Sequence, residues 1–145
     1  MDFKPYEHKA QYYETDKMGI IHHSNYIRYF EEARIDFMSQ GGLSYEKMEE
    51  EGIMSPVIGI ECTYKKSLTF GDTALIYPYV KEFNGIKLTI GYKITNKATG
   101  ELCCTGESRH CFLKNGKPIS LKKEAPKFYD LFNTMPREEK WYILP

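Results

Sequence analysis

One long amphipathic helix is the feature that most constrains what this sequence can fold into. Its apolar stripe repeats at helical spacing along one face and consists of Tyr26, Ile27, Phe30, Ala33, Phe37 and Met38. Charged residues occupy the opposite side, and Ser24 or Asn25 is placed to cap the amino-terminal end. Gly41 and Gly42 end the helix, as glycine commonly does. Such a helix needs an apolar surface against which to bury its stripe.

Strand-like segments supply that surface. Strand-forming residues gather in residues 3–13, 53–64, 73–83, 86–95 and 101–113, with turn-forming residues between them. Asn84 and Gly85 predict a hairpin with a type I′ turn, because both residues tolerate a positive φ. Pro78 indicates an edge position or a bulge in its strand. Short helices are expected at residues 44–50 and 125–133.

The predicted fold belongs to the α+β class, with an antiparallel five-stranded sheet wrapped around the long central helix. Consecutive strands joined by tight turns imply antiparallel pairing, and the helix fills the curled sheet. The 145 residues match one domain, so we expect a single domain over residues 1–145, with a charged tail from about residue 122. Because exposed sheet edges must be paired or covered, we expect a homodimer.

Composition excludes several classes of protein. Lys plus Arg and Asp plus Glu each number 20, and a nucleic-acid-binding protein normally needs a basic excess. The four cysteines include no C-x-x-C pair, which argues against a structural zinc site and against a disulfide framework. Residues 1–10 lack the apolar segment of a secretory signal, and no apolar run is long enough to span a membrane. We therefore expect a cytoplasmic protein with no nucleic-acid partner, no metal and no membrane span.

The loop that leads into the long helix carries the densest group of chemically capable side chains. It contains Asp16, Gly19, His22 and His23. Backbone N–H groups at a helix start, together with the positive end of the helix dipole, can polarise a carbonyl group. A nearby carboxylate can attack that carbonyl or activate a water, and a histidine can transfer protons near neutral pH. The sequence therefore predicts a reaction centre in this loop.

An extended pattern surrounds the loop and carries a family resemblance. It runs Tyr12-x-Glu14-Thr15-Asp16-x-x-Gly19-Ile20-Ile21-His22-His23-Ser24-Asn25-Tyr26 and continues as Phe30-Glu31-Glu32-Ala33-Arg34. A second part follows as Tyr64-Lys65-Lys66-Ser67-Leu68-Thr69-Phe70-Gly71-Asp72. Together these segments resemble the signature of the 4-hydroxybenzoyl-CoA thioesterase-like hotdog proteins, a family that includes the short-chain acyl-CoA thioesterases associated with the Tol-Pal system. The resemblance covers roughly residues 3 to 120.

The resemblance implies hydrolysis of acyl-CoA thioesters to free carboxylic acid and CoA, with CoA as part of the substrate and no separate cofactor. Asp16 lies at the position of the family's catalytic carboxylate, either as nucleophile or as base for a water. His23 lies where many bacterial members carry a histidine near the thioester, and the backbone amides of residues 21–23 would form the oxyanion hole. The implied substrate-binding residues are Gly19, Ile21, His22, Asn25 and Tyr26, with Lys65, Lys66 and Arg109 chosen for CoA phosphates by charge and placement. Family members pair two protomers into one continuous sheet and bind acyl-CoA at the interface. Their dimers often form tetramers, so the resemblance implies a homodimer or a homotetramer.

Other interpretations of these residues remain open. Asp16 also fits a turn residue or a cap before the helix, and Lys65 and Lys66 also fit a charged turn. Asp16 with the two adjacent histidines suggests a metal site, although the spacing matches no familiar ligand set. At the level of function, the alternatives are a hotdog dehydratase, a thioesterase for acyl carrier protein, and a dimer that binds acyl-CoA without catalysis.

Overall fold

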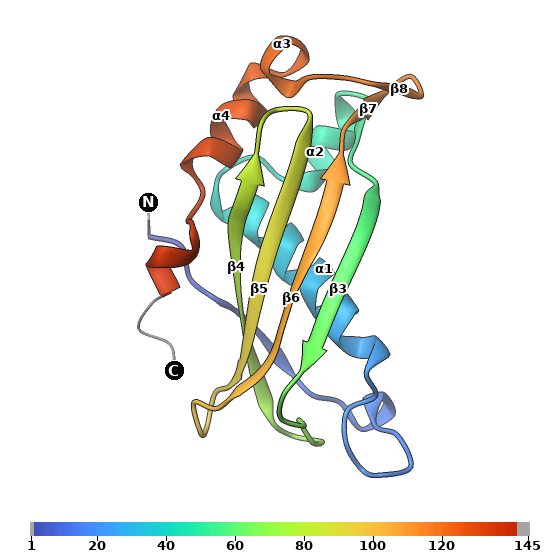
Figure 1. The fold of residues 1–145 in the computed structure, drawn as a ribbon, viewed down its shortest axis with the longest axis vertical. Coiled ribbons are helices and arrows are strands. Elements are labelled where there is room, and N and C mark those ends of the chain that lie inside the picture. The colour runs from blue at the N-terminus through green and yellow to red at the C-terminus, as the bar shows by residue number, and fades with distance from the viewer. Residues whose placement is uncertain (1, 142–145) are drawn as a thin grey trace.

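A five-stranded antiparallel sheet curls around one long helix in the structure, a computed structural model that describes residues 2–141 (Figure 1). The strands lie in the order β1-β4-β5-β6-β3. Their bounds are β1 (Tyr6–Lys9), β3 (Val57–Tyr64), β4 (Thr73–Phe83), β5 (Lys87–Asn96) and β6 (Leu102–Cys111). The predicted fold class is confirmed.

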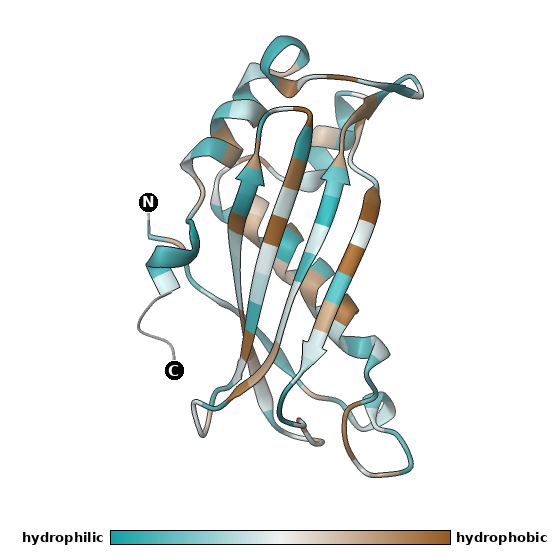
Figure 2. Cartoon of the chain, in the orientation of Figure 1, coloured by the Kyte–Doolittle hydropathy of each residue, from teal (hydrophilic) through white to brown (hydrophobic). Residues whose placement is uncertain are grey.

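Helix α1 (Ser24–Gln40) packs across the inner face of the sheet. The rings of Phe30 on α1 and Tyr92 on β5 stack with their centroids 4.3 Å apart. Gly106 on β6 makes room for this contact, because a Cβ atom there would lie 2.6 Å from the Phe30 ring. Figure 2 shows hydrophobic and hydrophilic residues alternating along the strands, as a sheet with one buried face requires.

The helix differs from the prediction at its start and in one residue of its stripe. His23 rather than Ser24 or Asn25 is the N-cap residue, and it makes no side-chain capping bond. The Asn25 amide is buried instead, and donates to the backbone carbonyls of Glu14 and His22 at 3.0 and 3.3 Å. Ile27 is 38% exposed, so its assignment to the buried stripe is wrong. Tyr29 is buried although it was not assigned to the stripe, and its hydroxyl donates a hydrogen bond to the Glu14 carboxylate inside the protein.

The hairpin between β4 and β5 is present, but its predicted type I′ turn is wrong. The Asn84 side chain accepts hydrogen bonds from the N–H groups of Ile86 and Lys87 at 2.9 and 2.8 Å, which stabilises a longer loop. A two-residue loop of the expected kind lies elsewhere. Asn115 and Gly116 have φ angles of 53° and 76° and join β7 (Leu113–Lys114) to β8 (Lys117–Pro118).

Three segments predicted as single strands are interrupted. In residues 53–64, Pro56 lacks the N–H that a ladder requires, and the segment divides into β2 (Ile53–Met54) and β3. β2 pairs with β7 in a small sheet of order β2-β7-β8, which also takes the end of the 101–113 segment. The 3–13 segment contains only β1 before the short helix η1 (Tyr12–Glu14). The other helices are α2 (Tyr45–Glu50), α3 (Leu121–Glu124), α4 (Pro126–Thr134) and η2 (Glu138–Trp141), and none in residues 2–141 is long and apolar enough to cross a membrane.

The carboxyl-terminal segment covers the part of β4 that β1 leaves unpaired. β1 pairs only with residues 73–76 of β4, so Pro78 lies at a local edge, as its sequence position indicated. The N–H of Val80 donates to the Pro136 carbonyl at 2.9 Å, and the Trp141 indole N–H donates to the Pro78 carbonyl at 2.9 Å. This side of the sheet is therefore not open to another strand.

A chain of polar groups crosses the core between α1 and the sheet. Arg34 donates to the Tyr92 hydroxyl at 3.0 Å, and that hydroxyl lies 2.6 Å from the Ser108 hydroxyl. Ser108 in turn lies 2.7 Å from Nε2 of His110, which is 1% exposed. Burial, and then the positive charge of Arg34, lower the pKa of His110 to about 4. His110 is therefore neutral in the folded protein at neutral pH.

Acidification is expected to destabilise the fold through His110. In the unfolded chain this imidazole binds a proton near pH 6.5, but in the folded protein only near pH 4. Between these values the unfolded state holds the extra proton, so the free energy of unfolding falls as the pH falls. From pH 7 to pH 5 the loss from this group is about 2 kcal/mol. Urea unfolding of the wild type and of His110→Gln at both pH values measures it, and an equal pH dependence in the two proteins would contradict the assignment.

Candidate active site

A short ladder of backbone hydrogen bonds shapes the loop that precedes α1. The N–H of His22 donates to the Glu14 carbonyl at 2.8 Å, and the N–H of Asp16 donates to the Ile20 carbonyl at 2.8 Å. Gly19 closes the tip with a φ of +81°, a conformation that glycine adopts without strain. The ladder therefore holds Asp16 on one arm of the loop and the histidines on the other.

The Asp16 carboxylate is half-buried, and only one of its oxygens is engaged within residues 2–141. Oδ1 accepts a hydrogen bond from the N–H of Met18 at 2.8 Å. Oδ2 has no hydrogen-bond partner in that part of the chain. One oxygen thus orients the carboxylate and the other remains available to a substrate or a water.

The backbone amides at the helix start are not all available for an oxyanion hole. The N–H of Ile21 donates to the Leu68 carbonyl at 2.8 Å, and that of His22 is used within the loop ladder. The expectation that these two amides face a substrate oxygen is therefore wrong, because each already has a backbone acceptor. Within the described residues, the amide of His23 has no such acceptor, and it lies at the positive end of α1.

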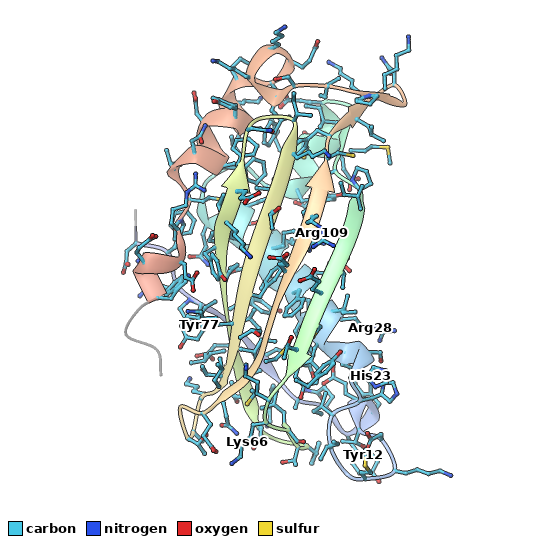
Figure 3. The ribbon with its side chains drawn as sticks, in the orientation of Figure 1. Tyr12, His23, Arg28, Lys66, Tyr77 and Arg109 are labelled. Atoms are coloured by element: carbon cyan, nitrogen blue, oxygen red, sulfur yellow. The ribbon has the colours of Figure 1, made fainter. Side chains whose placement is uncertain are left out.

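The two histidines have different surroundings. Their rings stack with centroids 4.1 Å apart, and the His23 ring is exposed whereas Nδ1 of His22 lies 2.8 Å from the Ser24 hydroxyl. The Tyr64 hydroxyl donates to the His23 backbone carbonyl at 3.0 Å, which ties the end of β3 to the helix start. Figure 3 shows His23 at this end of the molecule, on the same side as Tyr12.

A cavity of about 180 Å³ opens between the helix start and the end of β3. Its lining residues are Ile20, Ile21, Tyr26, Tyr64, Lys65, Lys66 and Ser67. Four of the predicted substrate-binding residues are thus brought together, although they lie far apart in the sequence. The Lys66 ammonium group pairs with Glu101 at 2.7 Å. Within residues 2–141, no carboxylate lies within ion-pair distance of Lys65.

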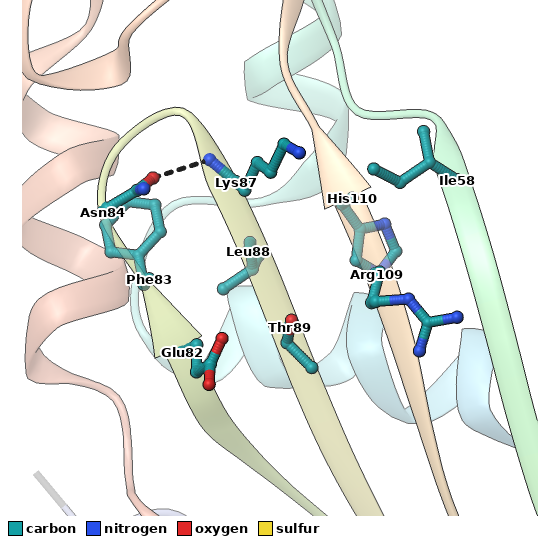
Figure 4. Close-up of a pocket in the computed structure, with 9 residues that line it drawn as sticks. All are labelled: Ile58, Glu82, Phe83, Asn84, Lys87, Leu88, Thr89, Arg109 and His110. Atoms are coloured by element: carbon teal, nitrogen blue, oxygen red, sulfur yellow. Dashed lines mark hydrogen bonds between the residues drawn. The ribbon is translucent and has the colours of Figure 1, made fainter.

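Arg109 is not part of this cavity. Its guanidinium group contacts the carboxylates of Glu107 and Glu61 at 3.1 and 3.3 Å. It lines a separate groove of about 600 Å³ near the β4–β5 hairpin, together with Lys87 and Ile58 (Figure 4). Figure 3 shows Arg109 well along the sheet from His23 and Lys66. Its charge and its placement in the sequence suggested its grouping with the lysines, whereas the strand register places it opposite Gly59, at the other end of β3.

Two residues that contact the loop received no role from the sequence. Tyr64 was seen only as part of the family pattern, and its contact with His23 depends on where β3 ends. Glu14 was seen as one polar residue among many, yet it is 6% exposed and sits at the base of the loop. Within residues 2–141 no group of three or more potential metal-ligating side chains gathers at any place.

A family model described as the thioesterase-like superfamily matches residues 11–130. The chain belongs to this superfamily. The predicted family, the hotdog fold and the predicted class of enzyme, a thioester hydrolase, are thereby confirmed. The roles of individual residues of this thioesterase-like protein stay predictions.

Similar proteins agree with this assignment. A Bacillus subtilis protein, YneP, provisionally named an acyl-CoA thioesterase, is 38% identical over 128 residues, which cover 87% of this chain and 92% of that protein. The structure of a DHNA-CoA thioesterase from Staphylococcus aureus superimposes with a TM-score of 0.85 at 36% identity, covering 90% of this chain and 88% of that one. The Haemophilus influenzae acyl-CoA thioesterase YbgC is 22% identical over 124 residues, or 81% of this chain and 87% of that protein.

Proposed function

We propose that this thioesterase-like protein hydrolyses acyl-CoA thioesters at the loop before α1, with Asp16 as the reacting carboxylate. The observation that carries the proposal is the loop itself. It holds a carboxylate with one unengaged oxygen, and it leads to a helix start whose His23 amide has no acceptor in residues 2–141. The names of similar proteins, which include acyl-CoA thioesterases, support acyl-CoA as the substrate class.

The proposed reaction uses the two ends of the loop together. Asp16 attacks the thioester carbonyl carbon, or takes a proton from a water that attacks it. Negative charge grows on the carbonyl oxygen, which accepts a hydrogen bond from the His23 amide at the positive end of the helix. The C–S bond breaks, and the departing CoA thiolate takes a proton through the His23 ring, which recovers a proton from the attacking water either directly or by way of Asp16. On the nucleophilic route, water then hydrolyses the mixed anhydride and restores Asp16.

The cavity beside the helix start is the proposed entrance for the substrate. Tyr26 and Tyr64 offer aromatic surface to the acyl group, and Lys65 offers an uncompensated charge for CoA phosphate. Lys66 is the weaker candidate because Glu101 already neutralises it. Arg109 has no role in this proposal for a single chain, since it lines another groove.

We further propose a homodimer that forms along β3. This strand has no partner on its outer edge within residues 2–141. Val57, Ile58 and Tyr64 on β3 are 46%, 54% and 47% exposed. A second copy pairing along β3 would satisfy the open edge and bury the apolar side chains. A tetramer would need a further surface.

The test is a substrate panel with the purified protein. Short, medium, long and aromatic acyl-CoAs are incubated with it and the release of free thiol is followed, with 1,4-dihydroxy-2-naphthoyl-CoA included because of the Staphylococcus aureus relative. We expect turnover of at least one acyl-CoA with release of the carboxylic acid. An enoyl product would identify a dehydratase instead. Turnover only of acyl carrier protein thioesters would replace acyl-CoA as the proposed substrate. Tight acyl-CoA binding in calorimetry without hydrolysis over hours would overturn the enzymatic proposal.

A further inference from the structure

The Glu14 side chain is a buried carboxylate with three hydrogen-bond partners from different parts of the chain. It is 6% exposed. Its Oε1 accepts from the N–H of Gln11 at 2.7 Å and from the Tyr29 hydroxyl at 2.9 Å, and Nε2 of His8 lies 3.1 Å from the same oxygen. Burial alone would raise the pKa of Glu14, but these three partners outweigh it and hold the pKa below its ordinary value. Glu14 is therefore ionised and fixed at neutral pH.

The backbone of Glu14 is bound as firmly as its side chain. Its carbonyl oxygen accepts from the N–H of His22 at 2.8 Å and from the Asn25 side-chain amide at 3.0 Å. These bonds form the base of the loop ladder. His22 immediately precedes His23, and Glu14 lies two residues before Asp16. The same residue is thus anchored to β1 and α1 through its carboxylate, and to the opposite arm of the loop and the first turn of α1 through its carbonyl.

We infer that Glu14 is a positioning residue, which sets the distance between the Asp16 carboxylate and the His23 amide by fixing the base of the loop. The inference rests on the proposed function for its effect on catalysis. The contacts of Glu14 that support the inference do not include the Asp16 carboxylate or the His23 amide. His8 also lies 3.5 Å from Glu32, which accepts from Tyr6, so a second layer of polar groups holds the Glu14 partners in turn.

The expected effect follows from how strongly catalysis depends on alignment. A misplacement of about 1 Å by a residue remote from the chemistry can cost about a hundredfold in rate. Removing the charge of Glu14 weakens its three hydrogen bonds, since bonds to an ionised acceptor are roughly twice as strong as neutral ones. The loop base then loosens without any loss of Asp16 or His23. Binding of CoA, which the proposal assigns to Lys65, does not depend on that base.

Steady-state kinetics of Glu14→Gln and Tyr29→Phe test the inference, with the acyl-CoA that the wild type turns over fastest. Both variants keep the size of the side chain. We expect kcat to fall at least about tenfold in Glu14→Gln and about threefold in Tyr29→Phe, with KM within about twofold of wild type. Glu7→Gln is the matched control, because Glu7 lies on β1 but is exposed, and within residues 2–141 its side chain pairs only with Lys97, at 2.7 Å. It should retain the wild-type kcat.

Amide hydrogen exchange provides a second measurement that needs no substrate. In Glu14→Gln the amides of Asp16 and His22 should exchange at least about tenfold faster, while amides of β5 keep their wild-type rates. A Glu14→Gln protein that is folded at the assay temperature and matches the wild type in both kcat and loop exchange overturns the inference. If that variant does not fold, Tyr29→Phe decides by the same criteria. If the wild type hydrolyses no acyl-CoA, the proposed function fails and the exchange rates alone decide the role of Glu14.

Discussion

Replacing Asp16 by asparagine should lower kcat by at least about a thousandfold, which corresponds to about 4 kcal/mol of transition-state stabilisation. Asparagine keeps the size of the side chain, and its carbonyl oxygen can still accept the hydrogen bond that Asp16 Oδ1 receives from the N–H of Met18. The loop is therefore retained. What is lost is the negative charge, which both a nucleophile and a general base require.

The measurement is thiol release from the best acyl-CoA by wild type and Asp16→Asn under identical conditions, with thermal unfolding of both. Asp130→Asn, an exposed change of the same kind on α4, is the control and should retain full activity. The thermal midpoint of Asp16→Asn should stay within about 3 °C of wild type, since a partly exposed side chain contributes little to stability. Undiminished turnover in Asp16→Asn would remove Asp16 from the mechanism.

Local sequence patterns predicted much of the fold, because helical periodicity and turn formation depend on residues that are close in the sequence. The spacing of Tyr26, Phe30 and Phe37 requires a helix with one buried face, and all three are buried in the structure. Turn residues between apolar segments predicted consecutive antiparallel strands. The failures arose where side chains compete with the backbone. The Asn84 side chain accepts a hydrogen bond from the backbone of its own loop and changes the turn. Asn115 was not predicted to lie in a tight turn, yet it has the positive φ of a two-residue loop.

The candidate site was predictable where it is contiguous in the sequence. Asp16 and His23 share one loop, so their neighbourhood followed from the start of the helix. Contacts that depend on strand register could not be predicted from the sequence. The pairing of β3 with β6 brings Tyr64 to His23 but leaves Arg109 with Glu61 and Glu107. The burial of Glu14 likewise depends on β1 and α1 meeting at the base of the loop.

Lysine substitutions at Val57 and Ile58 should convert the proposed dimer into monomers and lower kcat/KM at least about tenfold. Both side chains are about half exposed in the single chain, so lysines there are compatible with the fold of one protomer. In a β3-paired dimer the same positions would be buried, and a charged side chain on an edge strand opposes pairing with another strand. Tyr64, which lines the proposed substrate cavity, lies on this same strand and is 47% exposed. Loss of the partner would therefore also open the cavity to water.

Sedimentation velocity and the thiol-release assay on Val57→Lys/Ile58→Lys measure the two effects together. Ile86→Lys is the matched control, because Ile86 is 49% exposed but lies in the β4–β5 hairpin rather than on β3. It should sediment as the wild type does and keep its activity. A double variant that remains dimeric places the interface elsewhere. One that becomes monomeric at full activity shows that a single protomer holds the complete site, because the cavity between Tyr26 and Tyr64 then needs no second chain to close it.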